Sequence, residues 1–82
     1  MNAEKKPLPR VNFAEFRREL NWKKAQEAKP GAPLWFNGEP YIFHAVIEQD
    51  DLRHLRKSLW VEPQGGGREV IPFKYLEAVE WL

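Results

Sequence analysis

Side chains able to carry out acid–base, nucleophilic or metal chemistry are few in this chain of 82 residues. Histidine occurs only at His44 and His54, Ser58 is the only serine, and threonine and cysteine are absent. A serine–histidine–carboxylate triad would need Ser58 with one of these histidines, and no motif around them orients such a set. The lack of cysteine excludes thiolate catalysis and disulfides. The sequence therefore predicts a protein that is not an enzyme.

Two further patterns are typical of ligand sites but lack the spacing that the chemistry needs. Glu48, Asp50 and Asp51 are acidic, whereas a calcium loop has more oxygen ligands at fixed positions and a glycine turn. The glycines at 65–67 lack the lysine and following helix of a phosphate loop, so they predict a hairpin turn. His44 lies in an apolar run, which favours a half-buried histidine with one hydrogen bond. We expect no metal and no cofactor.

Basic side chains form the first candidate binding surface. Residues 1–31 carry eight Lys and Arg against four Glu, a net charge of +4, and residues 32–82 carry five against eight acidic residues, a net charge of −3. The cluster consists of Arg53, His54, Arg56 and Lys57 on a connection, joined by Arg17, Arg18, Lys23 and Lys24 on a predicted helix. Mobile Lys and Arg clusters of this kind contact phosphates. The alternative is a solvated face, or a basic segment that packs against the acidic remainder of its own chain.

Aromatic side chains form the second candidate surface. Trp60 alternates with Leu59 and Val61 and therefore points to the other face of its strand, with Tyr41 and Trp35 expected nearby. Exposed aromatics on a small β-domain stack nucleic-acid bases or hold a proline-rich peptide. The alternative, which we favour, is that the N-terminal helix covers Trp60.

The N-terminal third predicts a tail followed by a helix. Residues 1–10 are basic, and their two prolines favour an extended, flexible segment. Asn12, with Glu15 three residues later, is typical of a helix N-terminus, and the Lys-Pro-Gly at 29–31 ends the helix, which we place at about 12–28. Phe13, Phe16 and Leu20 lie in one narrow stripe at helical spacing. We expect this stripe to pack on the rest of the chain, because it is too small to stabilise a helix alone.

From residue 31 onward the pattern changes to short strands. Asn37-Gly38 is a strong hairpin signal because both residues tolerate positive φ, and residues 48–57 read as a charged connection. Alternation and turn residues predict five strands at 33–36, 41–47, 58–62, 68–71 and 78–82, with a tight 3₁₀ turn at 72–76.

This second half resembles the SH3-like small barrels. The resemblance rests on residues 31–38 with 41–47, on 59–61, and above all on 69–79, where a strand, a 3₁₀ turn and a last strand follow one another. It implies a closed five-stranded barrel over about 32–82, with Leu76 filling one end, and it implies no particular activity. The predicted fold class is α+β, mainly β, with an N-terminal helix packed on the barrel in a single domain over 11–82.

The function that these observations favour is that of a small binding module for a protein partner. The alternative is a nucleic-acid-binding accessory or regulatory protein, of a size that suits a phage or other mobile element, and an enzyme built at an oligomer interface is a third class. No run approaches the roughly 20 apolar residues that span a bilayer. The first residues lack a secretory signal. We therefore expect a cytoplasmic protein that does not contact a membrane.

Overall fold

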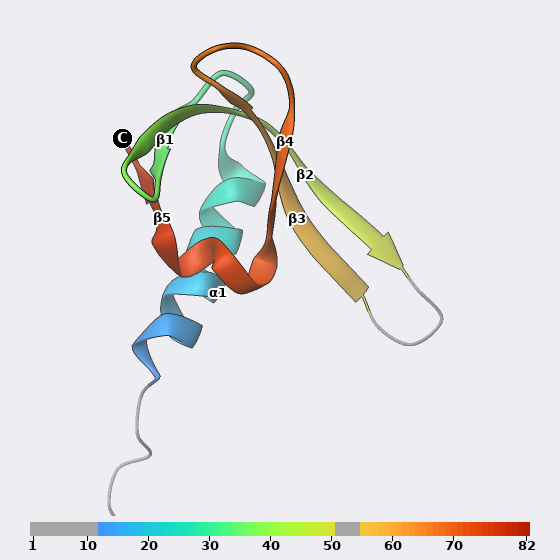
Figure 1. Ribbon diagram of the computed structural model, residues 1–82. Helices are drawn as coiled ribbons and strands as arrows, with labels where there is room; N and C mark the ends of the chain where they lie inside the picture. The colour runs from blue at the N-terminus through green and yellow to red at the C-terminus, as the bar shows by residue number, and fades with distance from the viewer. Residues whose placement is uncertain (1–11, 51–54) are drawn as a thin grey trace, which may run out of the picture.

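The computed structural model describes residues 12–50 and 55–82 of the chain. One helix lies against an antiparallel five-stranded sheet, and a 3₁₀ helix precedes the last strand (Figure 1). The elements are α1 (Phe13–Glu27), β1 (Pro33–Phe36), β2 (Glu39–Asp50), β3 (Leu55–Pro63), β4 (Glu69–Pro72), η1 (Phe73–Ala78) and β5 (Val79–Trp81). The structure is thus α+β and mainly β, as the sequence predicts.

Helix α1 has the ends that its sequence predicts. The side chain of Asn12 accepts a hydrogen bond from the backbone N–H of Glu15 at 3.1 Å, which satisfies one of the unpaired donors of the first turn. Ala28 has an extended backbone, and Gly31 takes a positive φ of 97° that lets the chain turn toward β1. A cap at one end and a break at the other therefore set the helix length.

The strands follow the order β4-β3-β2-β1-β5. Asn37 and Gly38 both have positive φ, 54° and 80°, and form the predicted tight turn between β1 and β2. Strands β2 and β3 are longer than predicted, because Glu48 pairs with Lys57 and Gln49 with Arg56 across the strands. The stretch 48–57 is therefore not only a charged connection, since both of its ends continue the ladder.

The sheet is open, and the predicted closed barrel is wrong. His44 is an extra residue in β2, because Phe43 pairs with Val61 and Ala45 with Trp60, and this bulge adds bend to the strand. Among the described strands, β4 and β5 each pair on one side only. The free edge of β5 meets α1 instead, where the carbonyl oxygen of Val79 accepts hydrogen bonds from two helix side chains.

The core lies between the concave face of the sheet, η1 and one face of α1 (Figure 1). Its members are the buried apolar side chains Trp22, Ala25, Leu34, Tyr41, Phe43, Leu59, Val61, Ile71, Leu76 and Val79. Leu76, in η1, has no exposed surface and belongs to this core, although the barrel end that it was predicted to fill does not form. None of the described residues belongs to a helix long and apolar enough to cross a membrane.

Candidate protein-binding surface

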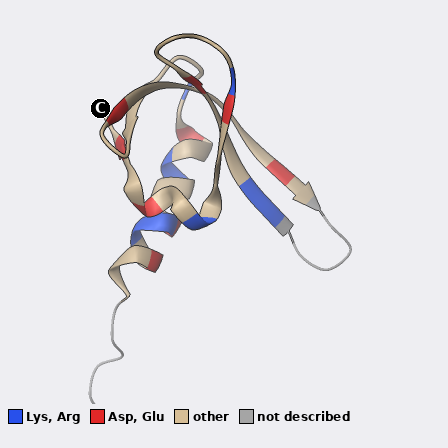
Figure 2. Ribbon diagram, in the orientation of Figure 1, with Lys and Arg blue, Asp and Glu red and all other residues tan. Residues whose placement is uncertain are grey.

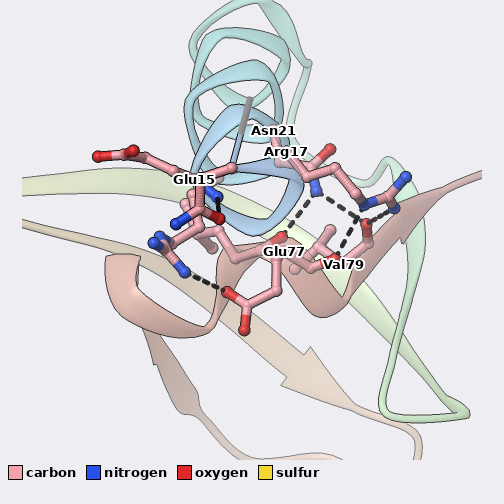
Figure 3. A network of polar contacts seen from close by, with 8 residues as sticks. Glu15, Arg17, Asn21, Glu77 and Val79 are labelled. Atoms are coloured by element: carbon pink, nitrogen blue, oxygen red, sulfur yellow. Dashed lines mark hydrogen bonds and ion pairs between the residues drawn. The ribbon is translucent and has the colours of Figure 1, made fainter. Parts of the chain in front are cut away.

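A buried amide fixes α1 to the C-terminal segment. The side-chain nitrogen of Asn21 donates to the carbonyl oxygens of Leu76 at 2.7 Å and of Val79 at 2.9 Å. Asn21 is 4% exposed, so these bonds are shielded from water (Figure 3). An unpaired amide or carbonyl in this position would carry a desolvation cost, which makes the contact specific in position and orientation.

Two arginines extend this anchor at the surface. Arg17 Nε donates to the carbonyl oxygen of Glu77 at 3.1 Å, and its Nη2 donates to that of Val79 at 3.4 Å. Arg18 Nη1 forms an ion pair with Glu77 Oε1 at 3.1 Å (Figure 3). Both side chains were candidates for phosphate contacts, but here they bind η1 and β5 of their own chain. Part of the basic N-terminal segment thus packs against the acidic remainder, which was the alternative interpretation.

Apolar packing completes the docking face of the helix, which consists of Asn21, Trp22 and Ala25. Trp22 is 5% exposed and meets Phe73 edge-on, with ring centroids 6.3 Å apart. The Nζ atom of Lys57 lies 5.5 Å from the Trp22 ring and 5.4 Å from the Phe73 ring, within cation–π range. Helix α1, η1 and β3 therefore pack together around the indole ring of Trp22.

The apolar helix stripe, which consists of Phe13, Phe16 and Leu20, is exposed. Phe13 retains 74% of its surface, Phe16 57% and Leu20 39%. At 100° per residue these side chains lie roughly opposite the docking face. The prediction that the stripe packs on the sheet is wrong, because Asn21, Trp22 and Ala25 occupy the contact and turn the stripe toward solvent.

A hollow borders the stripe on one side. It has a volume of about 490 Å³ and is lined by Phe16, Glu19, Leu20, Trp22, Lys23 and Gln26, all on α1. The hollow is open and shallow, so it extends the surface of the stripe along the helix and does not enclose a ligand.

The predicted basic residues of the connection lie on β3 or outside the described residues. Arg53 and His54 lie outside the described residues. Arg56 is exposed on β3 opposite Gln49, and Lys57 is held over Trp22 and Phe73. Lysines and arginines are spread over α1, β3 and η1 and alternate with carboxylates (Figure 2). Because Arg53 and His54 lie outside the described residues, a joint phosphate-contacting cluster stays a prediction.

Tyr41 is buried rather than available for binding. It pairs with Leu34 on the concave face of the sheet, packs edge-on against Phe36 at 6.1 Å, and its hydroxyl lies 3.3 Å from Glu69 Oε1. Burial raises the pKa of Tyr41, and the negative charges of Glu69 and Glu39 and the hydrogen bond to Glu69 raise it further. Tyr41 is therefore a core residue whose hydroxyl group reaches the carboxylate of Glu69.

Trp60 lies on the outer face of the sheet, and the prediction that the helix covers it is wrong. Its ring stacks on the ring of His44, with the two ring centroids 5.1 Å apart. The guanidinium carbon of Arg68 lies over the Trp60 ring, 4.5 Å from its centroid. His44 Nε2 is 2.9 Å from Glu62 Oε1, so this histidine is half-buried and hydrogen-bonded, as predicted. Because Leu59 and Val61 point to the core and α1 packs on that side, Trp60 must point away from the helix.

A second pocket lies at the end of the sheet away from η1. Its volume is about 290 Å³, at the lower limit for small-molecule sites, and its lining is mainly apolar, with three prolines among Pro33, Leu34, Pro40, Tyr41, Ile42, Glu62, Pro63, Gln64 and Leu82. Among the described residues, no group of three or more His, Cys, Asp or Glu side chains is placed to hold a metal ion.

Sequence reasoning missed Asn21 and Glu77, the residues that orient α1. The signal for Asn21 was its place between the apolar residues of a helix, where asparagine is unfavourable unless its amide is bonded elsewhere.

Comparison of the chain with protein-family models, curated proteins and solved structures finds no significant match.

Proposed function

We propose that this protein is a small non-enzymatic binding module that recognises a protein partner through the apolar helix stripe and its hollow. The observation that carries the proposal is the exposure of Phe13, Phe16 and Leu20 on a helix that the opposite face fixes in place. With roughly 200 Å² for each large side chain, the three leave about 300 Å² of apolar surface open, comparable to the largest apolar patch of a typical monomer, which is often functional.

A fixed helix is a favourable binding element. The anchor made by Asn21 and Trp22 orders α1 before binding, so a partner does not have to provide the free energy for ordering it. Aromatic side chains at the centre of an interface commonly contribute most of the affinity, and Phe16 lies at the centre of the stripe between Phe13 and Leu20. These features support recognition of an apolar protein surface.

Nucleic-acid binding has less support. Arg17 and Arg18 are engaged by Glu77 and Val79, and Lys57 lies over two aromatic rings. A phosphate would have to compete with these contacts. The proposal therefore keeps nucleic acid as an outcome of the experiment and not as a second function.

The SH3-like resemblance belongs to the same proposal. The strand order β4-β3-β2-β1-β5 and the 3₁₀ turn before β5 support a relation to those barrels. In this interpretation the sheet is an opened relative of such a barrel, and α1 packs on η1 with its outer face available for a partner.

The experiment uses the full chain as bait in chemical cross-linking from a cell lysate, with nuclease-treated and untreated samples. Phe16→Glu places a charge in the stripe, and Val70→Glu, at a residue that is 49% exposed on β4, is the matched control. We expect captured proteins with wild type and Val70→Glu, and none with Phe16→Glu, at equal melting temperatures. Equal capture by Phe16→Glu would overturn the proposal, and capture that nuclease abolishes would assign the surface to nucleic acid.

A further inference from the structure

We infer that the partner of the apolar helix stripe carries an aspartate or glutamate beside its apolar side chains, and that this carboxylate binds in a polar pocket between α1 and β5. The inference rests on the proposed function, because it states the chemistry of the partner for the same side of the helix. It follows from the position, the charges and the backbone donors of the pocket.

The polar pocket directly adjoins the apolar helix stripe. Its volume is about 260 Å³, and it is lined on one side by Arg17, Leu20, Asn21 and Lys24 of α1 and on the other side by β5. Leu20 belongs to both surfaces. At 100° per residue, Arg17 and Lys24 lie between the stripe and the docking face of the helix. A short segment of a partner can therefore place an apolar group on the stripe and a polar group in the pocket.

The charges of the lining favour a single negative group. Arg17 and Lys24 are positive and Glu80 is negative, which gives a net charge of +1. Arg17 is held in place because Nε and Nη2 donate to two backbone carbonyl oxygens, and this leaves its Nη1 amino group for a ligand (Figure 3). The side chain of Lys24 is exposed and has no ion pair or hydrogen bond within residues 12–50 and 55–82. One carboxylate balances this charge and accepts charge-assisted hydrogen bonds from both cations.

The free edge of β5 adds backbone donors to the pocket. The backbone N–H of Leu82 donates to the carbonyl oxygen of Pro33 in β1 at 3.3 Å. Because the hydrogen-bonding groups of successive residues point to opposite sides of a strand, the N–H of Trp81 points away from β1, to the edge where Val79 meets α1. The indole Nε1 of Trp81 is also buried, without a partner among the described residues. Unpaired buried donors are rare, so this side of the pocket favours a ligand that accepts hydrogen bonds.

An acidic protein segment matches these features better than a nucleic acid does. A nucleic acid needs several lysines and arginines along its phosphates, whereas the pocket has two basic side chains and borders an apolar surface. An amphipathic segment presents apolar side chains in a row with polar ones at its border. Such a segment fills the stripe and the pocket together.

The first test is an NMR titration of the isotope-labelled full chain with phenylacetate, a carboxylate with an apolar ring. We expect shifts of the N–H resonances of Leu20, Lys24 and Trp81, the indole included, and none with the matched amide phenylacetamide. Lys24→Gln should raise the dissociation constant of phenylacetate about threefold to fivefold, the change expected for one partly exposed ion pair. Lys29→Gln, at an exposed lysine beyond the helix end, is the matched control and should not change it.

Three results of this titration would overturn the carboxylate site. They are equal shifts with the amide, no shift at these residues up to the solubility of phenylacetate, and equal affinity of Lys24→Gln and wild type. Larger shifts at the same residues with inorganic phosphate would assign the pocket to phosphate and likewise overturn the inference.

The second test determines whether the partner uses the pocket. The lysate capture is repeated with Lys24→Glu and with Lys29→Glu as the matched charge reversal. We expect Lys29→Glu to capture the wild-type set of proteins and Lys24→Glu to lose it, at equal melting temperatures. Full capture by Lys24→Glu with loss by Phe16→Glu would overturn the carboxylate inference and keep the protein-binding proposal. Full capture by both variants would overturn both, and loss by Lys24→Glu alone would keep the pocket and overturn the role of the stripe.

Discussion

The two faces of α1 differ in burial: one packs against the rest of the chain and the other faces solvent. The docking face joins one amide, one indole and one methyl group, from Asn21, Trp22 and Ala25, and all three are buried. The apolar helix stripe has three large apolar side chains, and all three are exposed. The face with more apolar surface is therefore not the one that the fold buries.

The difference shows that specific partners outweigh apolar content when a helix chooses its contact. Leu76 and Val79 present carbonyl oxygens at the end of η1 and the free edge of β5, and these groups need donors. Asn21 supplies them from within the helix, and Trp22 fills the space beside Phe73. The stripe offers no donor and therefore cannot replace this face.

The largest expected effect comes from Trp22→Ala. Removing a buried indole leaves a cavity between α1, η1 and β3, and large-to-small changes of this kind cost about 3–5 kcal/mol. A single core of this size rarely supplies more than roughly 3–5 kcal/mol of stability, so the variant should be close to unfolded at room temperature. Urea denaturation followed by circular dichroism measures the loss, with Trp22→Phe as the milder control. A small loss would mean that the polar anchor alone holds the helix.

Asn21→Ala should have the next largest effect. The carbonyl oxygen of Leu76 would keep only the bond from the backbone N–H of Val79, and that of Val79 would keep only the longer bond from Arg17. Losing the two buried hydrogen bonds of Asn21 costs about 1–3 kcal/mol, at roughly 0.5–1.5 kcal/mol for each. Asn21→Asp keeps the shape but turns the donor into an acceptor, so its loss at neutral pH should be at least as large. If both variants melt like wild type, the comparison between the two faces rests on Trp22 alone.

A pH titration tests the burial of Tyr41 in the sheet independently of the contacts that hold α1. Burial raises the pKa of Tyr41 above its ordinary 10.0, so above about pH 10 the phenol ionises more readily in the unfolded chain than in the folded one. The contribution of this group to the free energy of unfolding is complete below pH 10 and is lost as the pH rises through the folded pKa. Melting temperatures between pH 8.5 and 11 should fall more for wild type than for Tyr41→Phe. Equal slopes would contradict the burial of the hydroxyl.

Local signals predicted the elements of this fold well. Asn12 and the Lys-Pro-Gly at 29–31 defined the helix, and Asn37-Gly38 defined the hairpin, because each acts through its own backbone conformation. The alternation of Leu59 and Val61 correctly placed both residues in the core. Such features depend on a few neighbouring residues and can be derived without knowing the fold.

The orientation of the helix and the closure of the sheet could not be predicted in this way. The orientation depends on the carbonyl oxygen of Val79, which is 58 residues from Asn21 in sequence and becomes an acceptor for the helix only after folding. Counting apolar side chains favoured Phe13, Phe16 and Leu20 as the buried set, because the count assigns no value to the two bonds of Asn21. The candidate binding surface was therefore present in the sequence but interpreted as core.

Phe16→Ala should have the smallest effect on stability. Phe16 is 57% exposed on the side of α1 away from the core, and substitutions at such positions change the free energy of unfolding by roughly 0.5 kcal/mol or less. Alanine also has a higher helix propensity than phenylalanine, which offsets part of the lost contact with Leu20. The midpoint of urea denaturation should equal that of wild type. A loss comparable to that of Trp22→Ala would mean that the stripe is buried in solution against the chain itself, and it would remove the contrast on which the binding surface rests. An unchanged midpoint together with lost partner capture would assign the two faces of one helix to two tasks, folding for the docking face and recognition for the stripe.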